Sequence, residues 1–219
     1  MLCADIVFID QVAFLVAMSK HIKFITIRHI KDRKKETLLE AMDDTFIKYN
    51  KAGFVIKELH VDPEFECLQQ EMELNDIQVN LTAAEEHQSD IERLFRVIKE
   101  RFRAMYHRCP FAMWTKIMII RGASEAVKWL NAFPPSGGIS TTYSPHAIIT
   151  GKPVDYNKHC NIRFGSYVQA VTQNEPTNTP KERTIDGIFL RTLNNIQGGY
   201  EVMSLKTGKP VTRHQAPCY

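Results

Sequence analysis

Residues 4–18 read ADIVFIDQVAFLVAM, and this stretch decides the fold. Two apolar runs stand on either side of the polar pair at positions 10–11, which is typical of a tight turn. We therefore expect a strand over residues 4–9 and a second over residues 12–18, paired as a hairpin. Asp5 places a carboxylate near the start of the first strand. The chain thus opens with a hairpin that carries an acid among apolar neighbours.

The segments after the hairpin alternate between strand and helix patterns. The expected elements are a strand over residues 24–30, a helix near 33–50, a strand over 54–61, a short helix near 65–74 and a short strand near 77–81. Pro63 enforces the break after the 54–61 strand. The order βββαβαβ predicts an α/β fold with a mixed sheet and helices packed on it, and not a doubly wound parallel sheet.

The helix expected over residues 90–107 is the best-defined element. Its apolar stripe consists of Ile91, Leu94, Phe95, Ile98, Phe102 and Met105. At about 100° per residue, Glu92, Arg96, Lys99 and Arg103 share a different stripe within roughly 60° of one another. The ordinary explanation of Glu92 and Arg96 is an exposed ion pair worth about 0.3–0.5 kcal/mol. The alternative is a carboxylate and three cations that serve a common site.

The last third of the chain changes character. We expect a helix near residues 112–132, then a turn-rich stretch that extends to residue 155. Four strands follow, expected over residues 164–169, 186–190, 198–205 and 211–213, with a hairpin turn at 207–209. A polar loop over residues 173–181 separates the first two. Short strands divided by Gly-rich turns predict a small C-terminal β-barrel of about 50 residues.

Composition excludes several classes of protein. The chain has 219 residues, of which 44% are apolar and 24% charged, as in ordinary globular proteins. No run approaches the roughly 20 apolar residues that span a bilayer, so we expect no membrane segment. The first residues lack the pattern of a secretory signal. Five scattered cysteines without a C-x-x-C pair indicate reduced thiols in an intracellular protein and no structural zinc.

The net charge of +3 hides a strong pattern along the chain. Residues 1–57 hold 10 Lys/Arg and 7 Asp/Glu, residues 58–92 hold 11 Asp/Glu and no Lys or Arg, and residues 93–219 hold 18 Lys/Arg and 7 Asp/Glu. An acidic cluster suits hard cations, and a basic segment suits a polyanion such as DNA. Two solvated surfaces of opposite sign are the simpler explanation of the charges taken alone.

Asp5, Asp62 and Glu92 stand at two strand ends and a helix start, from which carboxylates can converge on a pair of divalent cations. Other residues compete for these roles. Asp10 is a rival to Asp5, although it falls at the expected turn. Glu64, Glu66, Glu85 and Glu86 are near enough in the sequence to compete, although solvated positions explain most of them. His87 could assist the catalytic loop, although a surface position explains it better. Trp129 and Tyr167 are interpreted as packing residues, with base stacking as the alternative.

Several motifs together resemble the integrase core of retroelements, most closely that of copia-type long-terminal-repeat retrotransposons. Residues 61–65 (VDPEF) are similar to the family's Asp, short turn, Glu-Phe signature, and residues 87–93 (HQSDIER) stand where the family approaches its Glu-Arg pair. Residues 129–134 (WLNAFP) and 144–153 (SPHAIITGKP) are similar to its later Leu-Asn, Pro and Gly-Lys-Pro motifs. The resemblance covers most of the chain and lies in the order and spacing of these motifs.

The resemblance implies a domain order and a site. It implies a ribonuclease-H-like catalytic core over residues 1–135, a connecting segment over 136–162 and a Src-homology-3-like β-barrel over 163–215. Asp5, Asp62 and Glu92 would be the catalytic and metal-binding residues, with Mg²⁺ or Mn²⁺ as cofactor. The DNA-binding residues are expected to be Arg96, Lys99 and Arg103.

The implied activity is DNA strand transfer, which joins the ends of retroelement cDNA to target DNA. The implied partners are these two DNAs and further copies of the chain, and the expected location is intracellular, in the nucleus. The chain departs from the family at Pro63, at Ser89-Asp90 in place of a glycine, and in lacking a zinc module. It therefore resembles an excised piece of a polyprotein or a relic copy. A non-catalytic nucleic-acid-binding remnant and a hydrolytic nuclease stay open as alternatives.

Overall fold

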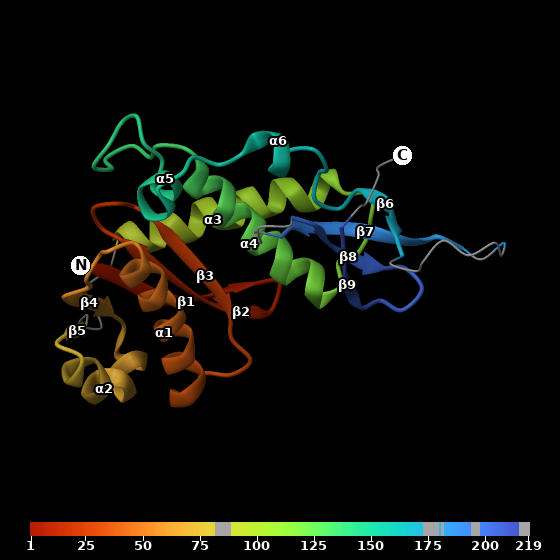
Figure 1. Ribbon diagram of the computed structural model, residues 1–219. Helices are drawn as coiled ribbons and strands as arrows, with labels where there is room; N and C mark the ends of the chain where they lie inside the picture. Colours follow the sequence, from red (N-terminus) through yellow and green to blue (C-terminus); the bar gives the residue numbers. More distant parts are fainter. Residues whose placement is uncertain (82–88, 173–179, 181, 194–197, 215–219) are drawn as a thin grey trace. The chain divides into compact units, whose positions relative to one another are not determined.

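The computed structural model describes residues 1–81, 89–172, 180, 182–193 and 198–214, drawn in Figure 1. The chain divides into two compact units. The first consists of residues 1–103 and 126–154, and the second of residues 104–125 and 155–219. Each unit is therefore built from two separate pieces of the chain.

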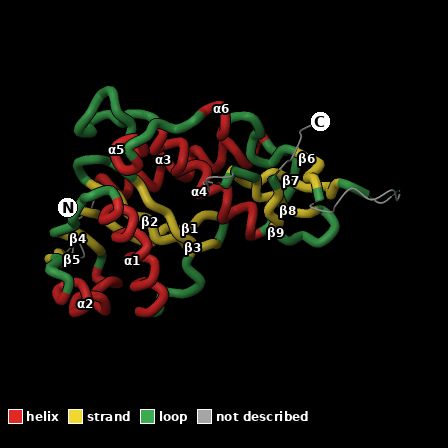
Figure 2. Tube along the Cα trace, in the orientation of Figure 1, coloured by secondary structure: helices red, strands yellow, loops and turns green. Residues whose placement is uncertain are grey.

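The first unit contains a five-stranded mixed sheet. Its strands are β1 (Leu2–Ile9), β2 (Val12–Ser19), β3 (Ile25–His29), β4 (Glu58–Val61) and β5 (Gln78–Leu81), in the spatial order β3-β2-β1-β4-β5. The β1–β2 and β2–β3 pairs are antiparallel, whereas β1–β4 and β4–β5 are parallel. Figure 2 shows these strands in yellow. The mixed sheet predicted from the order of the sequence patterns is confirmed.

The β1–β2 hairpin closes at the predicted turn. Asp10 and Gln11 have φ values of 46° and 64°, the left-handed conformation that both central residues of a type I′ turn adopt. The ladder pairs Ile9 with Val12, which leaves these two residues as the whole loop. The twist of this turn matches that of the flanking strands, so the short connection fixes the register of the hairpin.

Helix α1 (Lys35–Lys51) covers one face of the sheet (Figure 1). Side chains alternate along a strand, so the even-numbered residues of β1 point to this face. The core on this face includes Leu2, Ala4, Leu15, Ala17, Leu38, Met42 and Tyr49. The odd-numbered residues of β1, among them Cys3, Asp5 and Val7, point to the opposite face, where α3 begins.

The region around β4 differs from the prediction in two ways. The strand begins at Glu58 and not at residue 54, because the chain is still leaving α1: Gly53 has φ 79°, and the Phe54 N–H donates to the Tyr49 carbonyl at 3.0 Å. After Asp62, the predicted helix near 65–74 divides into a 3₁₀ helix, η1 (Pro63–Leu68), and α2 (Gln69–Leu74). Pro63 at the first position sets the start of η1.

The remaining helices are α3 (Ser89–Arg108), α4 (Lys116–Ala132), α5 (Pro145–Thr150) and α6 (Tyr156–His159). Helix α3 confirms the prediction for residues 90–107, and α4 begins four residues later than the predicted residue 112. Helix α5 lies where only turns were predicted. Its Ser144 cap accepts the Ala147 N–H at 3.2 Å, and Gly151 ends it with φ 71°. Among the described residues, no helix is both long and apolar enough to cross a bilayer.

The second unit contains a four-stranded antiparallel sheet. Its strands are β6 (Tyr167–Val171), β7 (Thr184–Thr192), β8 (Tyr200–Ser204) and β9 (Pro210–Arg213), in that spatial order. Val168, Ala170, Phe189 and Val202 form its core. The predicted strand at 164–169 starts late because Gly165, at φ 82°, still belongs to a turn. The four strands were predicted, and their closure into a barrel stays a prediction.

One buried acid connects the helical and sheet parts of this second unit. Glu201 on β8 is 7% exposed, and its carboxylate accepts hydrogen bonds from Arg121 of α4 at 2.7 Å and from Arg191 of β7. A buried carboxylate needs such partners, because an uncompensated charge in the interior is costly. The first turns of α4 are thereby fixed to the sheet.

Candidate active site

Asp5 and Asp62 lie side by side where β1 and β4 meet. The parallel register pairs Ala4 with Val61, so Asp5 and Asp62 occupy the next position along each chain. Adjacent strands are about 4.8 Å apart, and residues in register point to the same face. Asp62 keeps this extended direction, with φ −70° and ψ 161°, because it precedes Pro63. The sheet therefore brings together two acids that are distant in the sequence.

The carboxyl group of Asp5 has a perturbed pKa. The pKa of Asp5 is raised from 3.8 to about 6. Burial is the largest cause, the Ile6 N–H that donates to its Oδ1 at 2.5 Å acts against it, and the carboxylates of Asp62, Glu64 and Glu92 add to the increase. Like charges disfavour ionisation only when they are near. Both other predicted catalytic acids are thus within electrostatic reach of Asp5.

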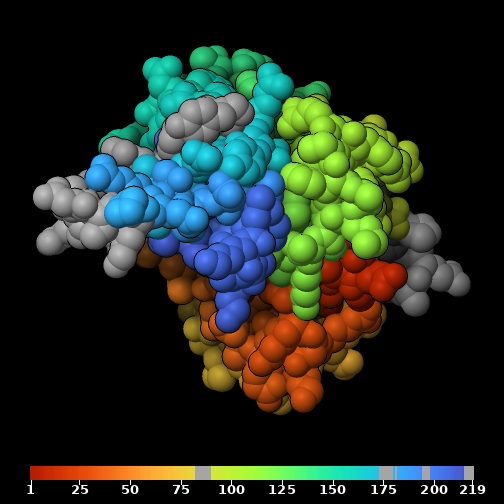
Figure 3. All heavy atoms as spheres, turned by 90° about the vertical axis from the view of Figure 1, so that its right-hand side faces the viewer, coloured from red at the N-terminus to blue at the C-terminus, as the bar shows by residue number. Residues whose placement is uncertain are grey.

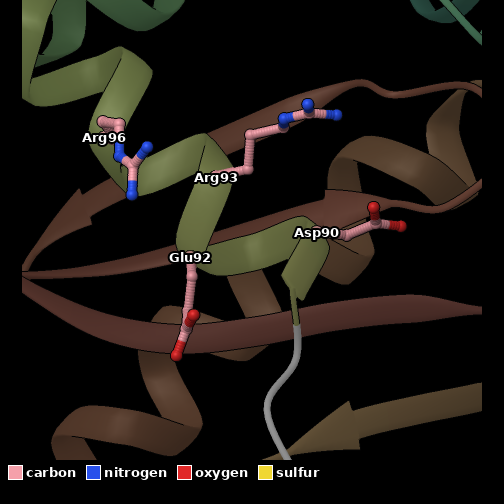
Figure 4. Close-up of a pocket in the computed structure, with 4 residues that line it drawn as sticks. All are labelled: Asp90, Glu92, Arg93 and Arg96. Atoms are coloured by element: carbon pink, nitrogen blue, oxygen red, sulfur yellow. The ribbon is translucent and has the colours of Figure 1, made fainter.

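Glu92 projects from the first turn of α3. The neighbouring Ile91 is 2% exposed and seats the helix start in the interior, while Glu92 itself is exposed. Figure 4 shows the Glu92 carboxylate directed across the strands, whereas Arg93 and Arg96 leave the helix in other directions. Helix α3 begins on the sheet face opposite α1 (Figure 1). The alternation of side chains along β1 directs Asp5 to this same face.

The donor chemistry of this region fits a hard divalent cation. Mg²⁺ prefers oxygen ligands and keeps several waters, so one or two carboxylates suffice to hold it. Asp5 and Asp62 supply such a pair, and a bound cation would offset the repulsion between their carboxylates. Within the described part of the chain, no three His, Cys, Asp or Glu side chains are grouped closely enough to hold one metal ion. These side chains therefore fit a largely hydrated ion that Asp5 and Asp62 would hold, with Glu92 nearby.

The rival acids differ in their surroundings. Asp10 lies in the hairpin turn, five residues along the strand from Asp5, and the β1–β4 ladder includes only positions 2–4 of β1. Glu64 is near Asp5 and pairs with Arg33 at 2.8 Å, and Arg33 also lies 5.0 Å from the ring centre of Phe8. Glu66 is exposed. The other rivals, Glu85, Glu86 and His87, lie outside the described residues.

The predicted DNA-binding residues Arg96, Lys99 and Arg103 are all exposed on α3. Figure 3 shows the lime-coloured side chains of this helix uncovered on one face. An open pocket at the start of α3 is lined by Asp90, Glu92, Arg93 and Arg96. Arg93 was not predicted to belong with Glu92, because it lies about 100° from Glu92 around the helix axis.

The two aromatic residues singled out from the sequence have local partners. Trp129 is partly buried, and the ammonium group of Lys128 lies 4.9 Å from its ring centre. The hydroxyl group of Tyr167 donates to the Asp186 carboxylate at 2.5 Å, with the ring 39% exposed. These contacts agree with the packing interpretation and leave the exposed part of the Tyr167 ring accessible.

Comparison with known proteins gives one kind of match. The sequence matches no model of a known protein family. No curated protein matches it either. Solved structures do match, and among them is the crystal structure of the catalytic core domain of BIV integrase. The two chains are 18% identical with a TM-score of 0.51, over 68% of this chain and 93% of that one.

The matched part of the chain has a fold similar to that of this catalytic core domain. The likeness confirms the ribonuclease-H-like mixed sheet with flanking helices that the sequence predicts. At this level of identity it speaks for the fold alone. The copia type, the metal and the activity are therefore matters of proposal.

Proposed function

We propose that this protein is an integrase-type DNA strand-transfer enzyme of a copia-type retrotransposon. It joins the 3′ ends of element cDNA to target DNA by phosphoryl transfer. The observation that carries the proposal is the placement of Asp5 beside Asp62 in parallel register, with Glu92 within electrostatic reach. The fold of an integrase core supports it.

In this proposal the three acids have different roles. Two Mg²⁺ or Mn²⁺ ions, when bound, activate the attacking 3′-hydroxyl and stabilise the leaving oxygen. Asp5 would contribute to both ion sites, Asp62 to one and Glu92 to the other. The partial burial of Asp5 strengthens its attraction for a cation, because less water screens the charge. Its pKa of about 6 leaves it ionised at neutral pH.

The exposed cations of α3 hold the DNA backbone beside the acids. Arg96, Lys99 and Arg103 contact phosphates, which positions DNA without reading its sequence. The C-terminal sheet is proposed to close as a Src-homology-3-like barrel. Because two cDNA ends have to be held together, the active form is a homo-oligomer, and the reaction takes place inside the cell, in the nucleus.

A second candidate is a non-catalytic, nucleic-acid-binding remnant of a retrotransposon polyprotein. The specific observation in its favour is that no metal-ready group of three ligands occurs among the described side chains. A remnant would keep the basic surface of α3 and the fold but lack activity. A hydrolytic nuclease would use the same acids with water as the nucleophile.

The test is a strand-transfer assay with a pre-processed DNA end and Mn²⁺. We compare the wild type with Asp62→Asn, and we include Asp76→Asn as a matched control, since Asp76 is an exposed acid in a turn. The proposal predicts joined product in the wild type and in the control variant, and none in Asp62→Asn.

Other outcomes separate the alternatives. Cleaved DNA without joined product would indicate the nuclease. Binding of DNA without either reaction, equal in all three proteins, would identify the remnant and end the catalytic proposal.

A further inference from the structure

An ion pair joins the β2–β3 turn to the first turn of α3. The Lys23 ammonium lies 3.5 Å from the Asp90 carboxylate, and the side chains are 19% and 48% exposed, respectively. Asp90 stands two residues before Glu92 in the same turn of the helix. The pair is therefore a direct connection between the sheet and the turn of helix that carries the third acid.

Lys23 is held firmly on the sheet side of this connection. Its backbone has the left-handed φ of 59°, and its N–H donates to the Ser19 carbonyl at 2.9 Å. The Ser19 hydroxyl accepts the Ile22 N–H at 3.2 Å, and the next carbonyl, that of Phe24, accepts the Tyr49 hydroxyl at 2.8 Å. The turn that presents the ammonium group is thus fixed at several points.

The position of Asp90 on the helix decides what the pair can control. At 100° per residue, Asp90 and Glu92 lie about 160° apart around α3, with the buried Ile91 between them. Ile91, Leu94, Ile98 and Phe102 are buried and hold one face of the helix. The Lys23–Asp90 pair adds a restraint at the first turn, on nearly the opposite side from Glu92.

We infer that Lys23 and Asp90 are positioning residues that set the direction of the Glu92 carboxylate toward Asp5 and Asp62. The inference rests on the proposed function, because it assigns the pair a role at the same acids. Neither residue contacts the reacting atoms, since Lys23 acts through Asp90 and Asp90 acts through the helix.

The experiment measures Mn²⁺ affinity by titration calorimetry, with thermal stability recorded for each protein. The variants are Lys23→Met, Asp90→Asn, their double variant and the conservative Lys23→Arg. Lys20→Met is the matched control, because it removes a cation from the same turn and leaves the Lys23–Asp90 pair in place. Asp62→Asn serves as the reference for loss of the site.

Lys23→Met is the decisive variant, because its two effects change the Mn²⁺ affinity in opposite directions. Removing a positive charge near a cation site strengthens Mn²⁺ binding through space, whereas losing the position of Glu92 weakens it. We expect Lys23→Met and Asp90→Asn each to weaken binding by about two- to five-fold, the scale of a partly exposed ion pair. The double variant should be no weaker than the singles, and Lys23→Arg should retain wild-type affinity.

Two different results would overturn the inference. If Lys23→Met binds Mn²⁺ as tightly as the wild type, or more tightly, as we expect of Lys20→Met, then the Lys23–Asp90 pair is ordinary surface charge. Wild-type protein that binds Mn²⁺ no better than Asp62→Asn would remove the proposed function, and the positioning role with it.

Discussion

At the scale of single residues, Asp5 couples folding to pH. Its pKa of about 6 in the folded chain, against an ordinary 3.8, means that the folded state binds the proton more tightly than the unfolded state. This contribution to stability is complete below about pH 4 and is lost as the pH rises through about 6. We expect Asp5→Asn to gain up to about 3 kcal/mol in unfolding free energy, relative to wild type, between pH 4 and pH 7.

Urea denaturation at several pH values, without divalent cations, measures this difference. Asp76→Asn is the control, and its stability should follow the wild-type pH profile. Parallel profiles of Asp5→Asn and the wild type would show that the Asp5 carboxyl group does not have the raised pKa.

Divalent cations should reverse the pH dependence of stability that Asp5 causes. Ligating carboxylates have to be deprotonated, so Mn²⁺ competes with the proton on Asp5. At pH 7.5 and a Mn²⁺ concentration about 100 times the Kd, we expect the unfolding free energy to rise by about 2.7 kcal/mol. At pH 5 the gain should be much smaller.

Thermal unfolding with and without Mn²⁺ at both pH values tests this expectation. Asp62→Asn should show little gain at either pH. An equal gain in the wild type and in Asp62→Asn would place the bound ion elsewhere on the chain.

The sequence predicts the candidate acids but not the contacts between them. Asp5 and Asp62 were found because Asp5 stands within one apolar run and Asp62 ends another. Their adjacency depends on the parallel pairing of Ala4 with Val61, which no local pattern encodes. The same holds for the pairs Lys23–Asp90 and Arg33–Glu64, whose partners are far apart in the chain.

At the scale of elements, Asn131 ties the end of α4 to the edge strand β3. Its side-chain amide accepts the Ile25 N–H at 2.9 Å and donates to the Ile25 carbonyl at 2.8 Å. Asn131 is 5% exposed, and β3 has its only described strand neighbour, β2, on the other side. The amide therefore pairs with the free edge of β3 as a further strand would.

Removing this amide should destabilise the first unit. Asn131→Ala leaves the N–H and the carbonyl of Ile25 buried without partners, and each such group costs about 1–3 kcal/mol. We expect a loss of roughly 2–4 kcal/mol in the unfolding free energy, measured by urea denaturation. Asn50→Ala, at an exposed position in α1, is the control and should change stability little. A loss no larger than that of the control would mean that water forms the hydrogen bonds to Ile25 in place of the amide.

Patterns at this scale predicted most elements, and the misses have physical causes. The hairpin, α1, α3 and the C-terminal strands follow from periodicity and turn residues. Helix α5 was missed although Ser144, Pro145 and Gly151 are the usual signals of a short helix, because six residues are too few to show periodicity. The late start of β4 depends on how the chain leaves α1, which composition does not reveal.

At the scale of the whole molecule, the charge pattern predicts how binding to DNA depends on salt. Each phosphate contact that is lost should lower the slope of log affinity against log salt by about 0.9. We expect replacement of Arg96, Lys99 and Arg103 by Ala to reduce the slope by up to about 2.7. Fluorescence anisotropy with duplex DNA over a range of salt concentrations measures it.

A matched control removes three exposed lysines from the part of the chain before β4, Lys31, Lys51 and Lys57. This variant has the same net charge as the α3 variant. Its slope should stay near that of the wild type. Equal slopes in the two variants would show that net charge, and not the surface of α3, determines binding.

The division into two units has a consequence for inheritance. The second unit needs residues 104–125, which lie within the span that supplies the first, and Arg121 of α4 is fixed there by the buried Glu201. A genetic crossover near residue 155 would therefore join residues 104–125 of one ancestor's second unit to residues 155–219 of another's. Such recombinants would have to match Arg121 to a foreign Glu201. The two parts of this chain are thus expected to descend together.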